Sequence, residues 1–120
     1  MADRVLFIGW NTPVRGREER GLEVFNEGIG LYGRMQQDGR IESFDVVLLD
    51  PNGGLNGYME LRGSNAQLDA VRQDEDFRRL LIDASLIVEN LRVVDGACNE
   101  GIARNMGMYQ EAIAQVPQKA

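Results

Sequence analysis

The sequence predicts an α+β fold in which a four-stranded antiparallel sheet carries helices on one face. Two observations predict the sheet: an apolar run of strand length at 4–10, and a hairpin whose arms, 41–50 and 57–62, flank a turn rich in Gly, Asn and Pro. The third observation is the element order, which is strand, helix, strand, strand, helix, strand, helix. The first six elements follow the split βαβ, ferredoxin-like pattern, and right-handed crossovers then put the first and third strands in the middle of the sheet.

The first strand is apolar on both faces. Its side chains alternate between two sets, which are Val5, Phe7 and Gly9 on one face and Leu6, Ile8 and Trp10 on the other. Both faces should therefore be covered, and one layer of helices covers only one of them. In a chain of this size, the second layer is expected to come from another copy.

A long helix is expected over 17–38 because its apolar residues recur at intervals of three and four. These residues are Leu22, Phe25, Ile29, Tyr32 and Met35, and Gly39 suits the position just beyond the helix end. Gly28, Gly30 and Gly33 match the spacing of a dinucleotide-binding loop, but that loop follows a strand. Close packing of this helix on the sheet is therefore favoured over nucleotide binding.

Two shorter helices should follow the hairpin. Ser64 and Gln67 form a capping-box pattern, and Asp74 suits the N-cap of a second helix over 75–84. A fourth strand is then expected at 86–94, where β-branched residues are frequent.

A C-terminal helix is expected over 99–116, ended by Pro117. Its apolar residues form a stripe with spacings of four and three, consisting of Ile102, Met106, Tyr109, Ile113 and Val116. Such a stripe belongs in a core or at an interface.

Composition limits the functional classes. The 120 residues predict one domain, 1–120, and a net charge of −6 argues against nucleic-acid binding. The sequence has no histidine, which removes the commonest general base and metal ligand. A single cysteine, no signal-peptide pattern and no apolar run long enough to span a membrane favour a cytoplasmic protein without membrane contact. No metal-ligand spacing stands out, and no cofactor is expected.

The candidate ligand-binding residues are Trp10, Tyr58, Glu60, Arg62 and Arg92, which we expect to form a polar spot on the sheet face that the helices leave open. If a second subunit covers this face, Glu60 becomes partly enclosed and is the candidate general base. The alternative is that Glu60 and Arg62 only form ion pairs within the sheet or across a dimer.

Several stretches, 23–27, 32–36, 39–44, 55–58 and 75–81, resemble the dimeric α/β-barrel superfamily, in an uncharacterised bacterial branch. The resemblance covers about residues 4–98. It implies a homodimer in which two ferredoxin-like subunits press their open sheet faces together. The histidine used by several enzyme groups of that superfamily has no counterpart here.

Two functional hypotheses follow. The first is a protein that binds a small organic ligand in the barrel, alternatively as a cofactor-free monooxygenase- or isomerase-like enzyme. The second is a non-catalytic interaction or assembly protein whose polar sheet face is dimer packing. A cavity of about 300 Å³ or more beside Glu60 would favour the first.

Overall fold

The computed structural model describes residues 1–117, so the last three positions of the predicted domain 1–120 lie outside the described residues. In chain order the elements are β1 (Arg4–Trp10), α1 (Glu18–Gln37), β2 (Ser43–Leu48), β3 (Gly57–Gly63), α2 (Asn65–Gln73), α3 (Glu75–Ser85), β4 (Arg92–Ala97) and α4 (Glu100–Ala114).

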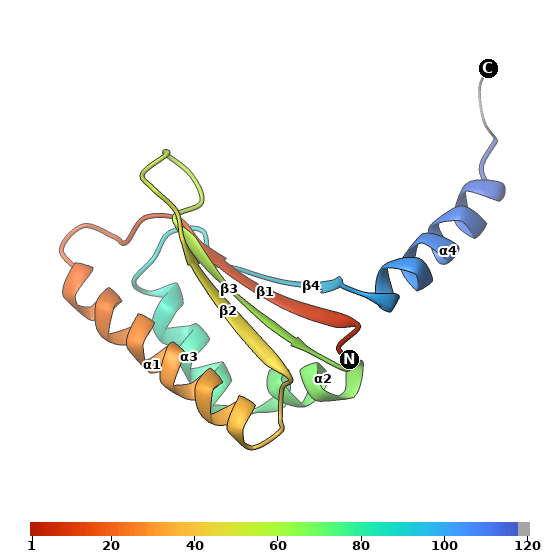
Figure 1. Cartoon of the computed structure of the whole chain (residues 1–120). Coiled ribbons are helices and arrows are strands. Elements are labelled where there is room, and N and C mark those ends of the chain that lie inside the picture. The colour runs from red at the N-terminus through yellow and green to blue at the C-terminus, as the bar shows by residue number, and fades with distance from the viewer. Residues whose placement is uncertain (118–120) are drawn as a thin grey trace.

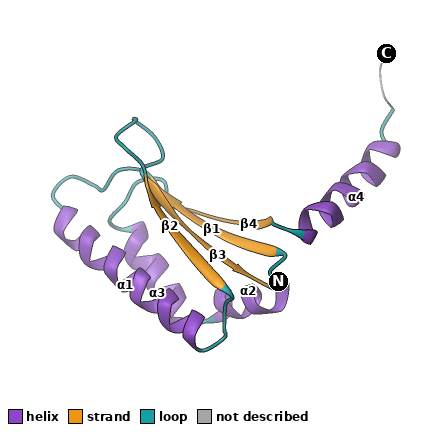
Figure 2. Ribbon diagram, in the orientation of Figure 1, coloured by secondary structure: helices purple, strands orange, loops and turns teal. Residues whose placement is uncertain are grey.

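The strands form one antiparallel sheet with the order β2-β3-β1-β4. The first and third strands lie in the middle, so the predicted ferredoxin-like topology is confirmed. Helices α1, α2 and α3 lie on one face of the sheet, and α4 extends away from it (Figures 1 and 2). We call the opposite sheet face the open face.

Strand alternation divides the sheet side chains between the two faces. Leu6 and Ile8 of β1 and Met59 and Leu61 of β3 lie under the helices and are buried. They pack with Leu31, Tyr32, Met35, Leu68, Val71 and Phe77 in one apolar core. Burial of these large side chains is the main source of the fold's stability.

Helix α1 ends as predicted, since Gly39 has a φ of 73°, a conformation that glycine adopts without strain. Its predicted apolar stripe is partly wrong, because Leu22 is 66% exposed whereas Val24, Gly28 and Leu31 are buried. Near the start of α1, the side of the helix that faces the core is therefore rotated by one residue from the predicted side. Gly28 lies mid-helix, and a Cβ there would lie 3.6 Å from Met59 and Leu80. Gly28 thus shows the predicted packing on the sheet rather than a nucleotide-binding turn, whereas Gly30 and Gly33 face no atom of the sheet within 4 Å.

Both predicted N-caps are present. The Gln67 amide donates to Ser64 Oγ at 3.1 Å, and the Ser64 amide donates to Gln67 Oε1 at 2.8 Å. The Phe77 amide donates to Asp74 Oδ2 at 3.0 Å. These bonds satisfy donors that the first turn of a helix otherwise leaves unpaired.

The prediction of a strand at 86–94 is wrong at both ends. Leu86 caps α3, and 87–89 pair with the segment after β1, through Val14 N to Ile87 O at 2.7 Å and Asn11 N to Glu89 O at 2.9 Å. Asn90 then takes a φ of 58°, which breaks the extended backbone. Strand β4 begins only at Arg92, opposite Gly9.

Helix α4 contacts the domain mainly through its first turn. A Cβ on Gly101 would lie 2.0 Å from the carbonyl oxygen of Asp3, and Arg104 Nη2 forms an ion pair with Asp3 Oδ2 at 3.0 Å. The apolar side chains of Ile102, Met106 and Tyr109 are exposed. None of the helices in the described part of the chain is both long and apolar enough to cross a membrane.

Candidate functional site

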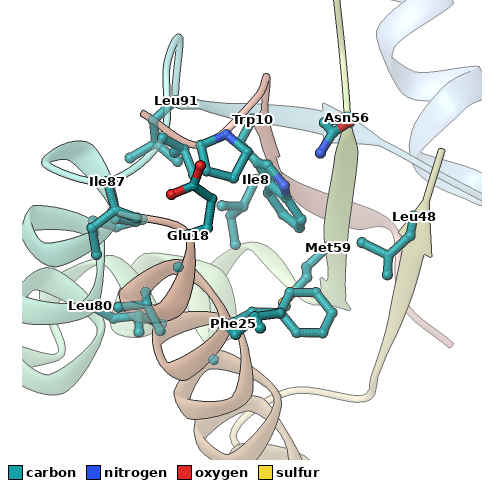
Figure 3. Close-up of a pocket in the computed structure, with 18 of the residues that line it drawn as sticks. Ile8, Trp10, Glu18, Phe25, Leu48, Asn56, Met59, Leu80, Ile87 and Leu91 are labelled. Carbon is teal, nitrogen blue, oxygen red and sulfur yellow. The ribbon is translucent and has the colours of Figure 1, made fainter. Parts of the chain in front are cut away.

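A cavity of about 410 Å³ lies between the sheet and the α1–α3 layer, at the end of the sheet where β1 finishes. Its walls are mostly apolar and come from β1, α1, β3, α3 and the loop before β4 (Figure 3). The labelled wall residues include Ile8, Trp10, Phe25, Met59, Leu80 and Ile87. We call this space the Trp10 cavity.

Small residues keep this end of the molecule hollow. Gly21 and Gly28 on α1 and Ala84 on α3 border the cavity, where larger side chains would occupy it. A Cβ on Gly21 would already lie 3.3 Å from Ile87. Farther along the same layer the core is closed, since Met35 and Phe77 are almost fully buried there and do not line the cavity.

The indole of Trp10 forms one wall together with Phe25. Their ring centroids are 6.1 Å apart with an interplanar angle of 72°, an edge-to-face arrangement. Trp10 is held by its backbone, since its carbonyl oxygen accepts a 2.7 Å hydrogen bond from the Asn56 amide. The rings are thus fixed at the end of β1 and on the second turn of α1.

Few polar side chains reach the cavity. Among the described residues that line it, Glu18 is the one charged group, and Asn56 and Tyr32 add an amide and a hydroxyl. Glu18 Oε1 accepts a 2.8 Å hydrogen bond from the Gly16 amide. Burial raises the pKa of Tyr32 far above its ordinary value, because the charged phenolate would be desolvated there. The lining suits an uncharged, largely apolar molecule.

The structure does not bring the five sequence-predicted site residues together. Trp10 lies on the helix side of β1 with Leu6 and Ile8, so the prediction that it shares the open face is wrong. The reason is the two-residue period of a strand, which gives Trp10 the same orientation as Ile8. The other four residues, Tyr58, Glu60, Arg62 and Arg92, lie on the open face, and none of them lines the Trp10 cavity.

On the open face, Arg62 lies between two carboxylates. It donates to Asp45 Oδ2 and, at 2.8 Å, to Glu60 Oε2. The ion pair within the sheet that the alternative interpretation requires is therefore present. Arg92 donates to Asn11 Oδ1 at 3.0 Å, and the ring centroids of Tyr58 and Phe7 are 5.2 Å apart with the rings tilted by 32°.

Sequence reasoning missed the α3 side of the cavity. Leu80, Ile87 and Leu91 line it, but the sequence pattern places Ile87 and Leu91 on a strand. A signal was present in Asn90, because Asn is among the residues that most readily take a left-handed backbone and so end a strand. Among residues 1–117, no cluster of three His, Cys, Asp or Glu side chains is arranged to hold a metal ion.

No protein-family model matches the sequence, and no curated protein matches it. Solved structures do match the fold. A dimeric protein of unknown function with a ferredoxin-like fold from Bacteroides fragilis superposes with a TM-score of 0.60 at 15% identity, covering 79% of this chain and 96% of that one. A dimeric ferredoxin-like protein of unknown function from Jannaschia sp. CCS1 gives 0.62 at 16% identity, covering 78% and 97%.

An enzyme shares the fold as well. The hydroxynitrile lyase from Passiflora edulis superposes with a TM-score of 0.63 at 15% identity, covering 83% of this chain and 97% of the lyase. Identities this low show the fold alone. The chain therefore has the ferredoxin-like fold that the sequence predicts.

Proposed function

We propose that the protein binds a small, uncharged and largely apolar organic molecule in the Trp10 cavity, and that it does so as a homodimer. The observation that carries the ligand proposal is the cavity itself. Its volume of about 410 Å³ lies within the range of known small-molecule sites, roughly 300–1,000 Å³.

The physical cost of the cavity supports a ligand. The exposed side chains of Leu22 and Leu48 lie on its rim, so the cavity opens to solvent, and its apolar wall lacks dispersion contacts with other protein atoms. An apolar space is a poor site for water, which needs two to four polar partners. A ligand that contacts Trp10, Phe25 and Leu80 would restore those contacts without desolvating a charge.

The homodimer is supported by the open face and by the dimeric proteins that share the fold. Val94, next to Phe7 on this face, is 51% exposed. Because apolar side chains here border the Asp45–Arg62–Glu60 ion pairs, the face resembles an interface with mixed apolar and polar character. The net charge of −6 argues against a nucleic-acid partner, and the single cysteine fits a cytoplasmic location.

Tryptophan fluorescence tests the ligand proposal directly, because Trp10 is the only tryptophan. The probe is 4-bromophenol, a flat apolar molecule with one hydroxyl and a quenching bromine. We expect saturable quenching of Trp10 emission and a rise in melting temperature. The anionic 4-bromobenzoate should give neither, because the cavity carries Glu18 and no cationic side chain among its described lining.

The matched variants are Ala84→Leu, which fills the cavity from α3, and Ala70→Leu, which adds the same side chain on an exposed position of α2. Ala84→Leu should weaken quenching by 4-bromophenol at least tenfold, and Ala70→Leu should leave it unchanged. Quenching that rises linearly without saturation, or is equal in both variants, would contradict binding in the cavity.

A further inference from the structure

Helix α4 leaves an apolar surface uncovered. Its residues Ile102, Met106 and Tyr109 recur at intervals of four and three and are 53%, 49% and 62% exposed. We call these three residues the α4 stripe. At its start the helix is anchored to the domain, where Asn99 Nδ2 donates to Ala2 O at 2.7 Å and Arg104 pairs with Asp3.

The chain exposes more surface than a compact monomer of its size. Its accessible surface is 7946 Å², whereas folded monomers of this mass expose roughly 6,500 Å². Its radius of gyration is 16.8 Å, against roughly 14 Å for a compact domain of this length. The excess surface exceeds the roughly 800 Å² per partner that a standard protein interface buries.

The direction of α4 indicates what covers its stripe. Figure 1 shows that α4 follows the edge strand β4 and runs out on the side of the sheet away from α1 and α3. A molecule seated on the open face therefore lies next to α4. Val94 on β4 is exposed on the same side shortly before the helix begins, so apolar surface continues from the sheet toward the arm.

We infer that α4 is an arm that packs its stripe against a second copy of this chain seated on the open face. This inference rests on the homodimer proposed above and extends it from the sheet to the helix. In a two-fold dimer the contact is made twice, because each copy offers both an arm and a body. The residues that anchor the arm, Gly101 and Asp3, then set the relative position of the two copies.

A membrane surface fits the arm less well than a second copy does. Helices that lie on membranes carry Lys and Arg on their polar face, whereas α4 carries Glu100, Arg104 and Glu111. The chain as a whole has a net charge of −6, which anionic lipids repel.

The test compares two neighbouring residues of α4 by sedimentation velocity of the full chain over a range of concentrations. Met106→Glu places a charge in the stripe. Gly107→Glu places the same charge on the next residue, which turns away from the stripe and has open space around it. Because both positions are at the surface, circular dichroism should show both variants folded.

We expect a wild-type dimer, a dimer dissociation constant at least tenfold higher for Met106→Glu, and no change for Gly107→Glu. Val94→Glu on the open face distinguishes the dimer contact through the sheet from the contact made by α4. If Val94→Glu dissociates the dimer and Met106→Glu does not, the sheet dimer stands and the arm is overturned. A wild-type monomer at micromolar concentration overturns both, while Trp10 quenching by 4-bromophenol still tests the cavity independently.

Discussion

The rings of Trp10 and Phe25 meet edge to face at 6.1 Å and form the wall of an apolar cavity between the sheet and α1. One ring stands at the end of β1 and the other on α1, so the contact joins the two layers of the fold at their hollow end. The two rings shape this wall of the cavity, and Trp10 is an intrinsic fluorophore within it.

Phe25→Leu should remove the ring pair and widen the cavity. We expect the free energy of unfolding to fall by about 1 kcal/mol, the usual worth of an aromatic pair, and Trp10 emission to move to longer wavelength as water approaches the indole. Urea unfolding followed by fluorescence measures both. Ile82→Ala is the control, because Ile82 on α3 is largely exposed, does not line the cavity and should change stability by less than about 0.5 kcal/mol.

Two glycines of α4 should respond to alanine in opposite directions. Gly107→Ala should raise the free energy of unfolding by about 0.5–1 kcal/mol, because alanine is the better helix former and nothing lies near the new methyl group. Gly101→Ala should lower it by about 1–3 kcal/mol, because its Cβ would overlap the Asp3 carbonyl oxygen. Equal stabilisation by both substitutions, measured by thermal unfolding, would show that α4 is not anchored on Asp3.

The carboxylate of Asp74 should make stability depend on pH. Partial burial acts to raise its pKa, but the Phe77 amide and the Arg40 guanidinium outweigh burial, so the pKa lies below its usual range. A carboxyl group with a lowered folded-state pKa contributes fully above its unfolded pKa of about 4, and the contribution is lost as pH falls through the folded value. Stability conferred by this group should therefore decline in acid.

Asp74→Asn isolates the charge, because asparagine is an equally good N-cap. The variant should be less stable than wild type at pH 7, by about 1 kcal/mol or less, and the difference should vanish near pH 2. Urea midpoints at the two pH values give the comparison. If the stability difference between wild type and Asp74→Asn grew as the solution was acidified, the lowered pKa of Asp74 would be contradicted.

Arg62 should stabilise the open face by offsetting the repulsion between two carboxylates. Asp45 and Glu60 are directly opposite across β2 and β3, and Arg62 bonds to both. Arg62→Met should lower the free energy of unfolding by about 0.5–1 kcal/mol, the usual cost of like charges in this position. Adding Asp45→Asn to Arg62→Met should recover part of the loss, and a double-mutant cycle would show no coupling if the ion pairs have no effect.

The fold could be predicted from the sequence because its signals are local. The alternation of 57–62, the capping box at Ser64 and the turn glycine at Gly39 each fix one element or boundary, and the element order then allows few topologies. The start of β4 could not be placed, because residues 87–89 are as β-branched as a true strand and differ only in the partner with which they pair.

The site was predicted less well, for a physical reason. The open-face residues Tyr58, Glu60 and Arg62 can be recognised in the sequence, because their polar side chains alternate with apolar ones along a strand. The Trp10 cavity is a gap left by small residues, and a gap appears only when α1 and α3 are packed together. Apolar residues that line a cavity look, in sequence, like residues that fill a core.

The most direct test of the ligand proposal is a crystal soaked with 4-bromophenol and measured at the bromine absorption edge. We predict one anomalous peak inside the Trp10 cavity, in van der Waals contact with the rings of Trp10 and Phe25. An empty cavity, with bromine bound instead beside Glu60 on the open face, would contradict the account and return the site to the strand face where the sequence first suggested it.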